Sequence, residues 1–341
     1  MRRISVLVKP VSGACGLDCA YCFYRELDPH GAKMSAETVA ALIRLIPDDT
    51  AVDFAFQGGE PLLAGVGFYR DFCEAVSSAK LTARYSLQTN GVGIDEEYCE
   101  LFRQYGFLIG LSFDGTKAAH DAVRKSKSGT GTYDAVISAA EMLGKYGVPF
   151  DVLTVITNRN ENDAAKIYED YKKRGFRFVQ LIPCLPLHNG DHGLCPTKDG
   201  LARFFCEFFD LWYDDVRAGR AAFDVREFSE LSDALRGRPT GCRYHGACVP
   251  QLVIESDGGM YPCDFFVRPE YRLGSVYDTS LDASLKSPGM AAFIADSRMG
   301  LDACRTCPYL SVCRGMCRRM RDLLRPRPCP WANIISHITQ K

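Results

Sequence analysis

Three closely spaced cysteines lie near the start of the chain. Residues 15–22 read Cys-Gly-Leu-Asp-Cys-Ala-Tyr-Cys, shortly after an apolar run at residues 4–8. Zinc sites and ordinary electron-transfer clusters close their coordination sphere with protein ligands. A 4Fe–4S cluster that is held by only three thiolates leaves one iron open, and a further ligand has to bind there. The spacing therefore predicts a cluster-binding loop that shares its metal with a ligand from outside the protein.

The composition excludes several classes of protein. Of the 341 residues, 47% are apolar, which is enough for a sizeable core in about two domains. The 41 basic and 42 acidic residues give a formal net charge of −1, so we expect neither nucleic acid nor an acidic membrane as a partner. The amino-terminal apolar run is too short for a signal peptide, and no apolar stretch approaches the roughly 18 residues of a membrane span. We expect a soluble, cytoplasmic protein.

The sixteen cysteines are unevenly distributed. Three lie at residues 15–22 and eight between Cys242 and Cys329. Without a secretion signal, this clustering indicates metal binding rather than disulfides. Eight thiolates make two sets of four, and on spacing alone a pair of structural zinc ions and a pair of iron–sulfur clusters are about equally compatible with them. The five scattered cysteines are Cys73, Cys99, Cys184, Cys195 and Cys206.

The scattered cysteines receive different interpretations. Cys73, Cys99 and Cys206 lie in helical patterns and are expected to be small buried apolar residues. Cys184 lies near the predicted cavity and Cys195 in a polar loop, and neither receives a role.

Strand and helix patterns alternate through the first half of the chain. Apolar runs predict strands at residues 4–8, 52–57, 85–89, 108–113, 150–156 and 178–183, and helical patterns at 35–46, 65–78, 95–105, 133–146 and 163–174 lie between them. This alternation predicts a parallel sheet with right-handed crossovers. Six units cannot close the usual eight-stranded barrel, so we expect an open, partial (β/α)6 barrel.

The remaining chain is predicted to form a linker and a cysteine-rich domain. Residues 197–219 carry an apolar aromatic stripe typical of a core-facing helix. Residues 252–262 read as a short hairpin, and short helices are expected around it. We therefore divide the chain into a barrel at residues 1–196, a linker at 197–238 and a cysteine-rich domain at 239–341.

Polar and glycine-rich segments follow the predicted strands. Cys15–Cys22 comes after the first strand, Gln-Gly-Gly-Glu-Pro (57–61) after the second, Thr-Asn-Gly (89–91) after the third and Asp-Gly (114–115) after the fourth. The carboxyl ends of parallel barrel strands meet at one face, where barrel enzymes place their active sites. A glycine at a strand end also lets the backbone approach a ligand, although a tight turn would explain it as well. The sequence predicts one site built from these four loops.

These motifs resemble those of the radical S-adenosylmethionine (SAM) superfamily with a SPASM domain, and most closely the anaerobic sulfatase-maturating enzymes. The resemblance extends along almost the whole chain. Its narrowest motifs are Phe-Gln-Gly-Gly-Glu-Pro at residues 56–61 and Tyr-Pro-Cys-Asp-Phe at 261–265. Further matching segments are residues 15–24, 86–91, 110–115, 210–213, 255–258 and 313–319. The presence of these motifs in the same chain favours iron–sulfur clusters over zinc ions at the late cysteines.

The resemblance implies SAM and three 4Fe–4S clusters as cofactors. The SAM-binding cluster would use Cys15, Cys19 and Cys22, the first auxiliary cluster Cys242, Cys248, Cys263 and Cys317, and the second Cys304, Cys307, Cys313 and Cys329. SAM would contact Tyr21, Gly59, Ser112, Arg124 and Leu185, with its carboxylate as the partner of Arg124. Asp264 matches the proposed catalytic base of the family, although in an unknown protein it would read as a solvated aspartate. Tyr24 and Gln57 match positions near the reacting side chain.

The implied activity is an oxidation of a peptide. A radical derived from SAM would take a hydrogen from the β-carbon of a cysteine or serine in an unfolded sulfatase polypeptide or peptide, and the product would be formylglycine. A one-electron donor such as a flavodoxin or ferredoxin would reduce the first cluster. Oxygen-labile clusters imply an anaerobic cytoplasm, and a monomer is expected.

Two other functions compete with this one. Another radical SAM–SPASM enzyme could crosslink or epimerise a ribosomally made peptide, but such enzymes often begin with a leader-binding domain, whereas this chain starts directly at its first strand. A non-enzymatic electron-transfer protein would explain the late cysteines but not the open cluster. Two features depart from the family: Met316 stands where glycine is more usual, and the chain ends soon after Cys329, which predicts a shortened or missing final helix. The six histidines show no metal spacing and are expected at the surface or in packing.

Overall fold

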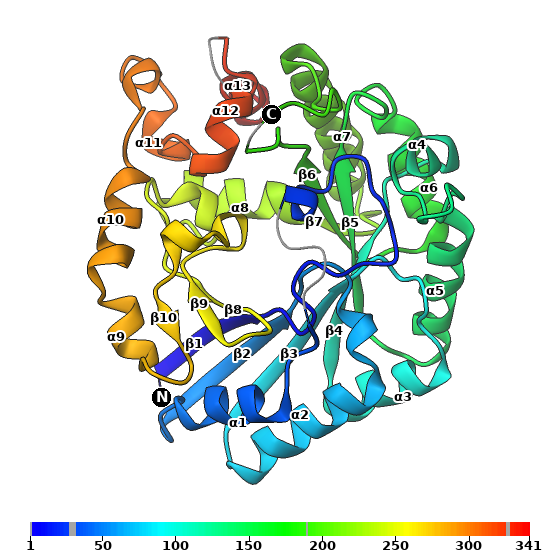
Figure 1. Ribbon diagram of the computed structural model, residues 1–341. Coiled ribbons are helices and arrows are strands. Elements are labelled where there is room, and N and C mark those ends of the chain that lie inside the picture. Colours follow the sequence, from blue (N-terminus) through cyan, green and yellow to red (C-terminus); the bar gives the residue numbers. More distant parts are fainter. Residues whose placement is uncertain (1, 27–31, 189, 325–327) are drawn as a thin grey trace.

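A ten-stranded, open sheet organises the protein. The computed structural model describes residues 2–26, 32–188, 190–324 and 328–341. All six predicted strands are confirmed and pair in parallel, in sequence order, at the centre of the sheet (Figure 1). They are β1 (Arg2–Val8), β2 (Thr50–Phe56), β3 (Thr82–Thr89), β4 (Phe107–Ser112), β5 (Phe150–Ile156) and β6 (Phe178–Pro183). The sheet does not close on itself, as expected for a partial barrel.

The predicted crossover helices lie on the outside of the curved sheet (Figure 1). Capping residues set where several of them begin: Ser35, Asp95 and Thr197 each accept a hydrogen bond from a backbone N–H in the first turn. The crossover helices are α1 (Ala36–Arg44), α2 (Val66–Ser78), α3 (Glu96–Tyr105), α5 (Tyr133–Lys145) and α6 (Ala164–Arg174), and the predicted linker helix is α7 (Lys198–Arg217). A further helix, α4 (Lys117–Val123), was not predicted, because seven mostly small and polar residues carry too little apolar periodicity.

Aromatic side chains fill much of the core. One cluster includes Phe54, Phe56 and Phe107 beneath the strands, and a second forms around the inner stripe of α7. On α7, Phe204, Phe205 and Phe208 have no exposed surface, which confirms that this helix faces the core. Burying each ring stabilises the fold by about 1.5–3 kcal/mol, so this long helix is firmly attached to the barrel.

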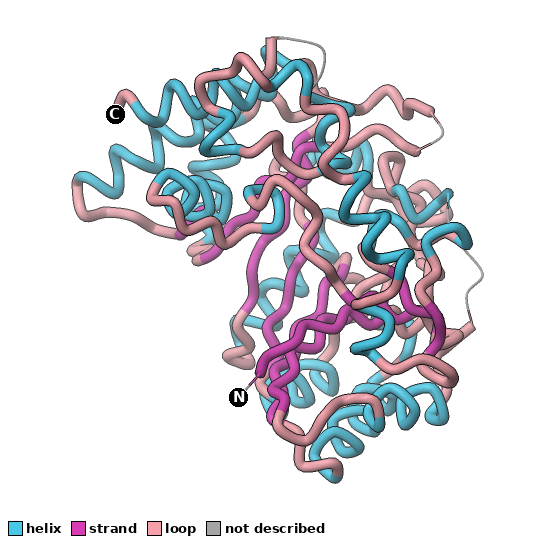
Figure 2. Tube along the Cα trace, turned by 90° about the vertical axis from the view of Figure 1, so that its left-hand side faces the viewer, coloured by secondary structure: helices cyan, strands magenta, loops and turns pink. Residues whose placement is uncertain are grey.

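The second half of the chain extends the same sheet. The hairpin of β8 (Leu252–Ile254) and β9 (Gly259–Tyr261) forms as predicted, and β10 (Gly274–Ser275) pairs with β9. The unexpected feature is that β8 pairs in parallel with β1. At the opposite edge, β7 (Asp224–Val225) pairs with β6. The division at residues 196 and 238 stays a prediction, but the barrel and the cysteine-rich segment share one sheet, as the side view also shows (Figure 2).

Short helices complete the second half. They are α8 (Arg226–Leu235), α9 (Leu281–Leu285), α10 (Pro288–Asp296), α11 (Leu310–Cys313), α12 (Arg321–Leu324) and α13 (Pro330–Thr339). The final helix expected to be shortened or missing is therefore present as α13. It packs on α7, where the rings of Phe205 and Trp331 lie edge to face at 5.4 Å. None of the described helices combines the length and apolar character needed to cross a membrane.

Candidate active site

A cavity of about 590 Å³ opens at the carboxyl ends of the parallel strands. Its walls come from the cysteine loop after β1, from the ends of β2 to β6 and from the turn after β9. Eleven residues singled out in the sequence line it together: Cys15, Cys19, Tyr21, Cys22, Tyr24, Gln57, Gly59, Ser112, Arg124, Leu185 and Asp264. Residues spread over most of the chain thus converge on one space.

The cysteine loop presents its three thiols to one another. Burial, with additional contributions from the thiols of Cys22 and Cys15, raises the pKa of Cys19 to about 12. The loop is anchored at the end of α4, because Asp18 N donates to Lys125 O at 2.8 Å and Ala20 N donates to Val123 O at 2.9 Å. A positive metal cluster would reverse the cost of ionising these thiols, so the arrangement suits metal ligation.

Two glycines after β2 allow the cysteine loop to pack against this strand end. Gly59 N donates to Ser12 O at 2.7 Å, and a Cβ on Gly59 would lie only 2.1 Å from Ala14 O. Gly58 has a φ of +142°, and a Cβ there would lie 2.6 Å from Ser12 O. Both positions therefore exclude a side chain because the backbone of the loop occupies that space. This packing gives the glycines a role besides approach to a ligand.

Glu60 joins the ends of β2 and β3. Its buried carboxylate accepts hydrogen bonds from Asn90 N and Thr89 Oγ1, both at 2.8 Å, and from Leu62 N at 3.0 Å. Burial nevertheless raises the pKa of Glu60 to about 7. The sequence placed Glu60 in the second motif without a role; the structure indicates that it fixes two site-forming loops relative to each other.

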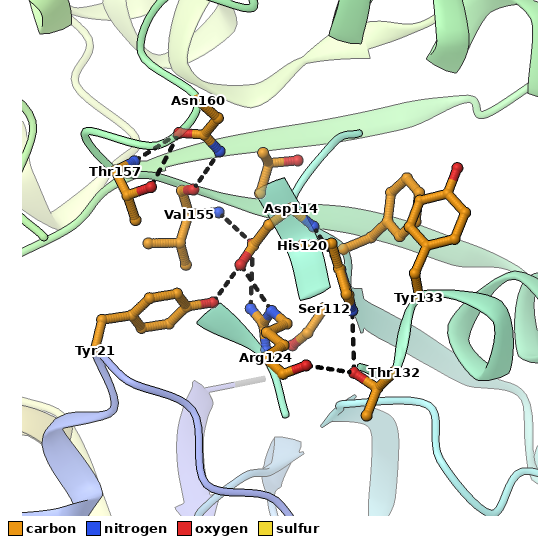
Figure 3. A network of polar contacts seen from close by, with 12 residues as sticks. Tyr21, Ser112, Asp114, His120, Arg124, Thr132, Tyr133, Val155, Thr157 and Asn160 are labelled. Atoms are coloured by element: carbon orange, nitrogen blue, oxygen red, sulfur yellow. Dashed lines mark hydrogen bonds and ion pairs between the residues drawn. The ribbon is translucent and has the colours of Figure 1, made fainter. Parts of the chain in front are cut away.

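Arg124 is paired with a carboxylate of the protein itself. Its Nε and Nη2 donate to the two oxygens of Asp114 at 2.8 and 3.3 Å, and the Tyr21 hydroxyl donates to Oδ2 of the same group (Figure 3). Val155 N also donates to Asp114, at 2.9 Å. The sequence assigned the SAM carboxylate as the partner of Arg124. Because a guanidinium carries five N–H donors, Arg124 retains donors for a ligand while Asp114 holds it in place.

His120 holds the backbone of Asp114 in this network. Its Nδ1 accepts from Asp114 N at 3.2 Å, so the proton lies on Nε2, which donates to Thr132 Oγ1 at 3.1 Å (Figure 3). Burial lowers the pKa of His120 to about 4, which keeps the ring neutral. This histidine is a packing residue, as expected, but one with a defined polar role.

Asp264 is the meeting point of the other predicted side chains. It lies in a 3-10 turn (Asp264–Phe266) directly after Cys263 and is 7% exposed. The Tyr24 hydroxyl donates to Oδ1, and Gln57 Nε2 donates to Oδ2 at 3.0 Å. The structure therefore unites the predicted base and both predicted substrate contacts in one hydrogen-bonded group.

Lys9 belongs to this group, and sequence reasoning missed it. Its side chain has no exposed surface, and Nζ lies 2.7 Å from Asp264 Oδ1 and 3.4 Å from Glu255 Oε1. The ammonium also lies 4.3 Å from the centre of the Tyr24 ring. The available signal was a single lysine directly at the end of a strand whose loop forms the site. A buried lysine between two carboxylates compensates part of their desolvation cost.

The eight late cysteines gather into the two predicted sets. Burial first, and then the thiols of Cys317 and Cys242, raise the pKa of Cys248 to about 11. The pKa of Cys263 is raised by burial and also by Cys317 and Cys248. The other four line one small cavity of about 50 Å³ near α13: Cys304, Cys307, Cys313 and Cys329. Segments separated by many residues thus bring the thiols together in fours.

The spacing of these thiols bears on the choice between zinc and larger clusters. A tetrahedral zinc ion holds its sulfurs at about 2.3 Å, and hence about 3.8 Å from one another. Among the described residues, the only group of three or more such ligand atoms within 4.8 Å is formed by Cys184, His192 and Cys195. The three predicted cluster sets are therefore more open than a zinc site. In a 4Fe–4S cluster each thiolate binds a different iron, so its thiolates lie farther apart than those of a zinc ion.

Outside the cluster sets, Cys73, Cys99 and Cys206 were expected to be buried, and the histidines to be surface or packing residues. Cys73 and Cys99 are buried in the core, as expected, and Cys206 is half-buried on α7. Of the histidines, His30 lies outside the described residues. His192 packs against Cys184, with Nε2 3.6 Å from Sγ.

Comparison with known proteins now defines the class. Residues 10–171 match the Radical SAM superfamily, and residues 247–308 match SPASM, an iron–sulfur cluster-binding domain. The protein is thus a radical SAM protein with a SPASM domain.

Full-length relatives narrow this assignment. The chain is 36% identical to the cysteine-type anaerobic sulfatase-maturating enzyme of Clostridium novyi, over 94% of this chain and 90% of that enzyme. It is 32% identical to the serine-type enzyme of Klebsiella aerogenes, over 92% and 79% of the two chains. The solved structure of anSMEcpe with bound AdoMet superimposes with a TM-score of 0.92 at 32% identity, covering 99% and 97%. The chain belongs to the anaerobic sulfatase-maturating enzyme family.

Proposed function

We propose that this enzyme binds SAM and three 4Fe–4S clusters and oxidises a cysteine or serine of a sulfatase polypeptide to formylglycine. The observation that carries the proposal is the cavity in which the three-thiol loop faces Asp264, Tyr24 and Gln57. Relatives at 30–37% identity include both cysteine-type and serine-type sulfatase-maturating enzymes. A similar structure, anSMEcpe, was solved with both AdoMet and a Cp18Cys peptide.

The cofactors and the protein divide the work. When bound, SAM and the clusters would supply one-electron chemistry that removes a hydrogen atom and an electron from the substrate. The three thiolates of Cys15, Cys19 and Cys22 would hold the cluster that leaves an iron open for SAM. Tyr21, Gly59, Ser112, Arg124 and Leu185 line the adjoining wall and are the proposed SAM contacts. Arg124, already oriented by Asp114, would direct its free donors at the SAM carboxylate.

Asp264 is the proposed proton acceptor. Its Oδ1 accepts a hydrogen bond from the Tyr24 hydroxyl and lies beside Lys9 Nζ, whereas Oδ2 accepts a hydrogen bond from Gln57. A carboxylate offers about four lone-pair positions, so Oδ2 retains acceptor capacity for the thiol or hydroxyl of a substrate. Tyr24 and Gln57 would hold the substrate side chain by exchanging these hydrogen bonds with it. The hydrogen bond through Gln57 ties the base to the glycine-rich loop after β2.

The late cysteines are the proposed ligands of two auxiliary clusters. The first set is Cys242, Cys248, Cys263 and Cys317; the second is Cys304, Cys307, Cys313 and Cys329. Because Cys263 precedes Asp264 directly, the first of these clusters would lie next to the proposed base and could accept the second electron of the oxidation. A one-electron donor such as a flavodoxin or ferredoxin would complete the cycle, and we expect the enzyme to act as a monomer in an anaerobic cytoplasm.

Mass spectrometry of a substrate peptide tests the proposal. The reconstituted enzyme is incubated without oxygen with SAM, a reductant and a peptide containing Cys-x-Pro-x-Arg or its serine counterpart. We expect conversion to the aldehyde mass, and the two rates rank the targets. If SAM is cleaved while both peptides stay unchanged, sulfatase maturation is refuted and peptide crosslinking or epimerisation becomes the better candidate.

A further inference from the structure

A second group of reactive side chains lies beside the cavity, between β6 and α7. Cys184 directly follows β6, and Cys195 lies two residues before Thr197, which caps α7. The Sγ atoms of both cysteines and a ring nitrogen of His192 all lie within 4.8 Å of one another. Such a group of a histidine and two thiols can bind a metal ion, or its two thiols can react with each other.

The hydrogen bonds of His192 argue against a metal ion. Nδ1 of the ring accepts from Leu194 N at 3.1 Å, which places the proton on Nε2. Nε2 then donates to Leu185 O at 2.9 Å, and the same N–H faces Cys184 Sγ at 3.6 Å. A histidine that ligates a metal through one nitrogen normally donates an N–H from the other, and here that other nitrogen is an acceptor. The two thiols are therefore the only side chains of this group that are left to react.

The two thiols differ in accessibility. Cys184 is 2% exposed, whereas Cys195 is half-buried and therefore the more accessible of the two. A hydrogen bond from the Cys184 thiol lowers the pKa of Cys195, and the positive charge of Arg319 acts in the same direction. A thiolate that is accessible, with a buried thiol next to it, is the usual arrangement of a cysteine pair that forms a disulfide in two steps.

We propose that Cys184 and Cys195 form a redox-active dithiol that a low-molecular-weight disulfide converts into an intramolecular disulfide. In the first step, the Cys195 thiolate attacks the reagent, forms a mixed disulfide and releases one thiolate. In the second step, Cys184 loses its proton and attacks Cys195 Sγ, which releases the second thiolate. Two protein thiols are oxidised by two electrons, and the reagent is reduced to two thiols.

The position of the pair gives the modification a local consequence. The disulfide would join the end of β6 to the segment that leads into α7. Cys184 and the adjacent Leu185 both line the cavity, and Arg319 donates to the carbonyl of Pro186 next along the chain. In the anaerobic cytoplasm proposed above, such a disulfide would be a transient product of oxidation rather than a permanent support.

Peptide mapping of the cluster-loaded enzyme tests the proposal. The enzyme is equilibrated without oxygen in mixtures of reduced and oxidised glutathione, quenched with acid, alkylated with N-ethylmaleimide and digested with trypsin. Trypsin releases Cys184 and Cys195 in one peptide, residues 178–198, that contains no other cysteine. The peptide of residues 204–217, which contains only Cys206, is the matched control. Dithiothreitol should reverse any disulfide that forms.

We expect peptide 178–198 to change from a doubly alkylated form to an unalkylated form that has lost two hydrogens. The control peptide should show no such loss. Double alkylation at every glutathione ratio would overturn the proposal. Protection from alkylation without the loss of two hydrogens, abolished by a chelator, would overturn it in favour of a metal site.

Single variants test the order of the two steps. In Cys184→Ser, we expect Cys195 to stop at the mixed disulfide with glutathione, because no second thiol is present to release it. In Cys195→Ser, the buried Cys184 should remain unmodified. Faster glutathione uptake by Cys184 than by Cys195 would contradict the assignment of Cys195 as the attacking thiol.

Discussion

Asp264 accepts hydrogen bonds from Tyr24 and Gln57 and forms an ion pair with Lys9. Only 7% of its surface is exposed. Three of these four residues could be found from the sequence, because they lie in motifs shared with a family. Lys9 could not, since a lysine after a strand is usually solvated and only the folded chain shows it buried against two carboxylates. A family motif thus identifies Asp264, Tyr24 and Gln57 in advance, whereas Lys9 is recognised only in the folded chain.

The first prediction concerns the proposed base. Asp264→Asn keeps the shape of the side chain but removes the negative charge that accepts a proton. We expect unchanged iron content and SAM binding, with peptide oxidation lowered by about 10²–10⁴-fold. Rates are measured by mass spectrometry under anaerobic conditions. Asp257→Asn, at an exposed position of the same segment, is the control and should keep its activity; wild-type turnover in Asp264→Asn would remove this residue from the role of base.

The second prediction concerns Lys9. Lys9→Met leaves Asp264 and Glu255 without their buried counter-charge, and removing one partner of a buried ion pair typically costs about 3–5 kcal/mol. We expect a lower midpoint of thermal unfolding and slower peptide oxidation. Lys166→Met removes an exposed lysine from an i,i+3 pair and should change neither. An unfolding midpoint equal to that of the wild type would show that the lysine does not compensate these charges.

At the scale of elements, the loops after β1 and β2 form one unit. The turn at Gly58 and Gly59 lies so close to the cysteine loop that neither position has room for a Cβ atom. The six strands and their helices could be predicted because each carries its own apolar periodicity. α4 could not, because its stability comes from packing rather than from a local pattern. The β8–β1 pairing was also unpredictable, because it joins residues as distant in the sequence as Val6 and Leu252.

The third prediction tests this contact. Gly59→Ala places a methyl group 2.1 Å from Ala14 O, which forces the cysteine loop to move. We expect SAM cleavage to fall by about a hundredfold, because displacements near 1 Å carry that cost at reacting centres. The matched control is Gly67→Ala in α2, where a Cβ meets no atom within 4 Å. Equal SAM cleavage in both variants would mean that the loop tolerates the displacement.

At the scale of the whole molecule, one sheet connects the barrel with the cysteine-rich segment. β8 adds to β1, so the turn that carries Cys263 and Asp264 is held against the loop that carries the first three cysteines. The sequence predicted both parts and the convergence of their site residues, but not the shared sheet. The proximity of Cys184 and Cys195 could not be predicted either, because neither cysteine belongs to a recognisable spacing motif.

The fourth prediction separates the three cluster sites. In Cys15→Ala, we expect SAM cleavage to be lost while the auxiliary sites remain loaded, so iron should fall from about twelve to about eight atoms per chain. Iron analysis and electron paramagnetic resonance measure this directly. Cys206→Ala, outside all three sets, should retain full iron and activity. Retained SAM cleavage in Cys15→Ala would refute the three-thiolate assignment.

The central claim is that the three-thiol loop and the Asp264 group act on one side chain of a bound peptide. The most direct measurement uses a Cys-x-Pro-x-Arg peptide with deuterium on the cysteine β-carbon, with the 5′-deoxyadenosine and the peptide product both weighed after anaerobic turnover. We expect deuterium in the 5′-deoxyadenosine, in step with formation of the peptide aldehyde. Unlabelled 5′-deoxyadenosine with an unchanged peptide would contradict the claim.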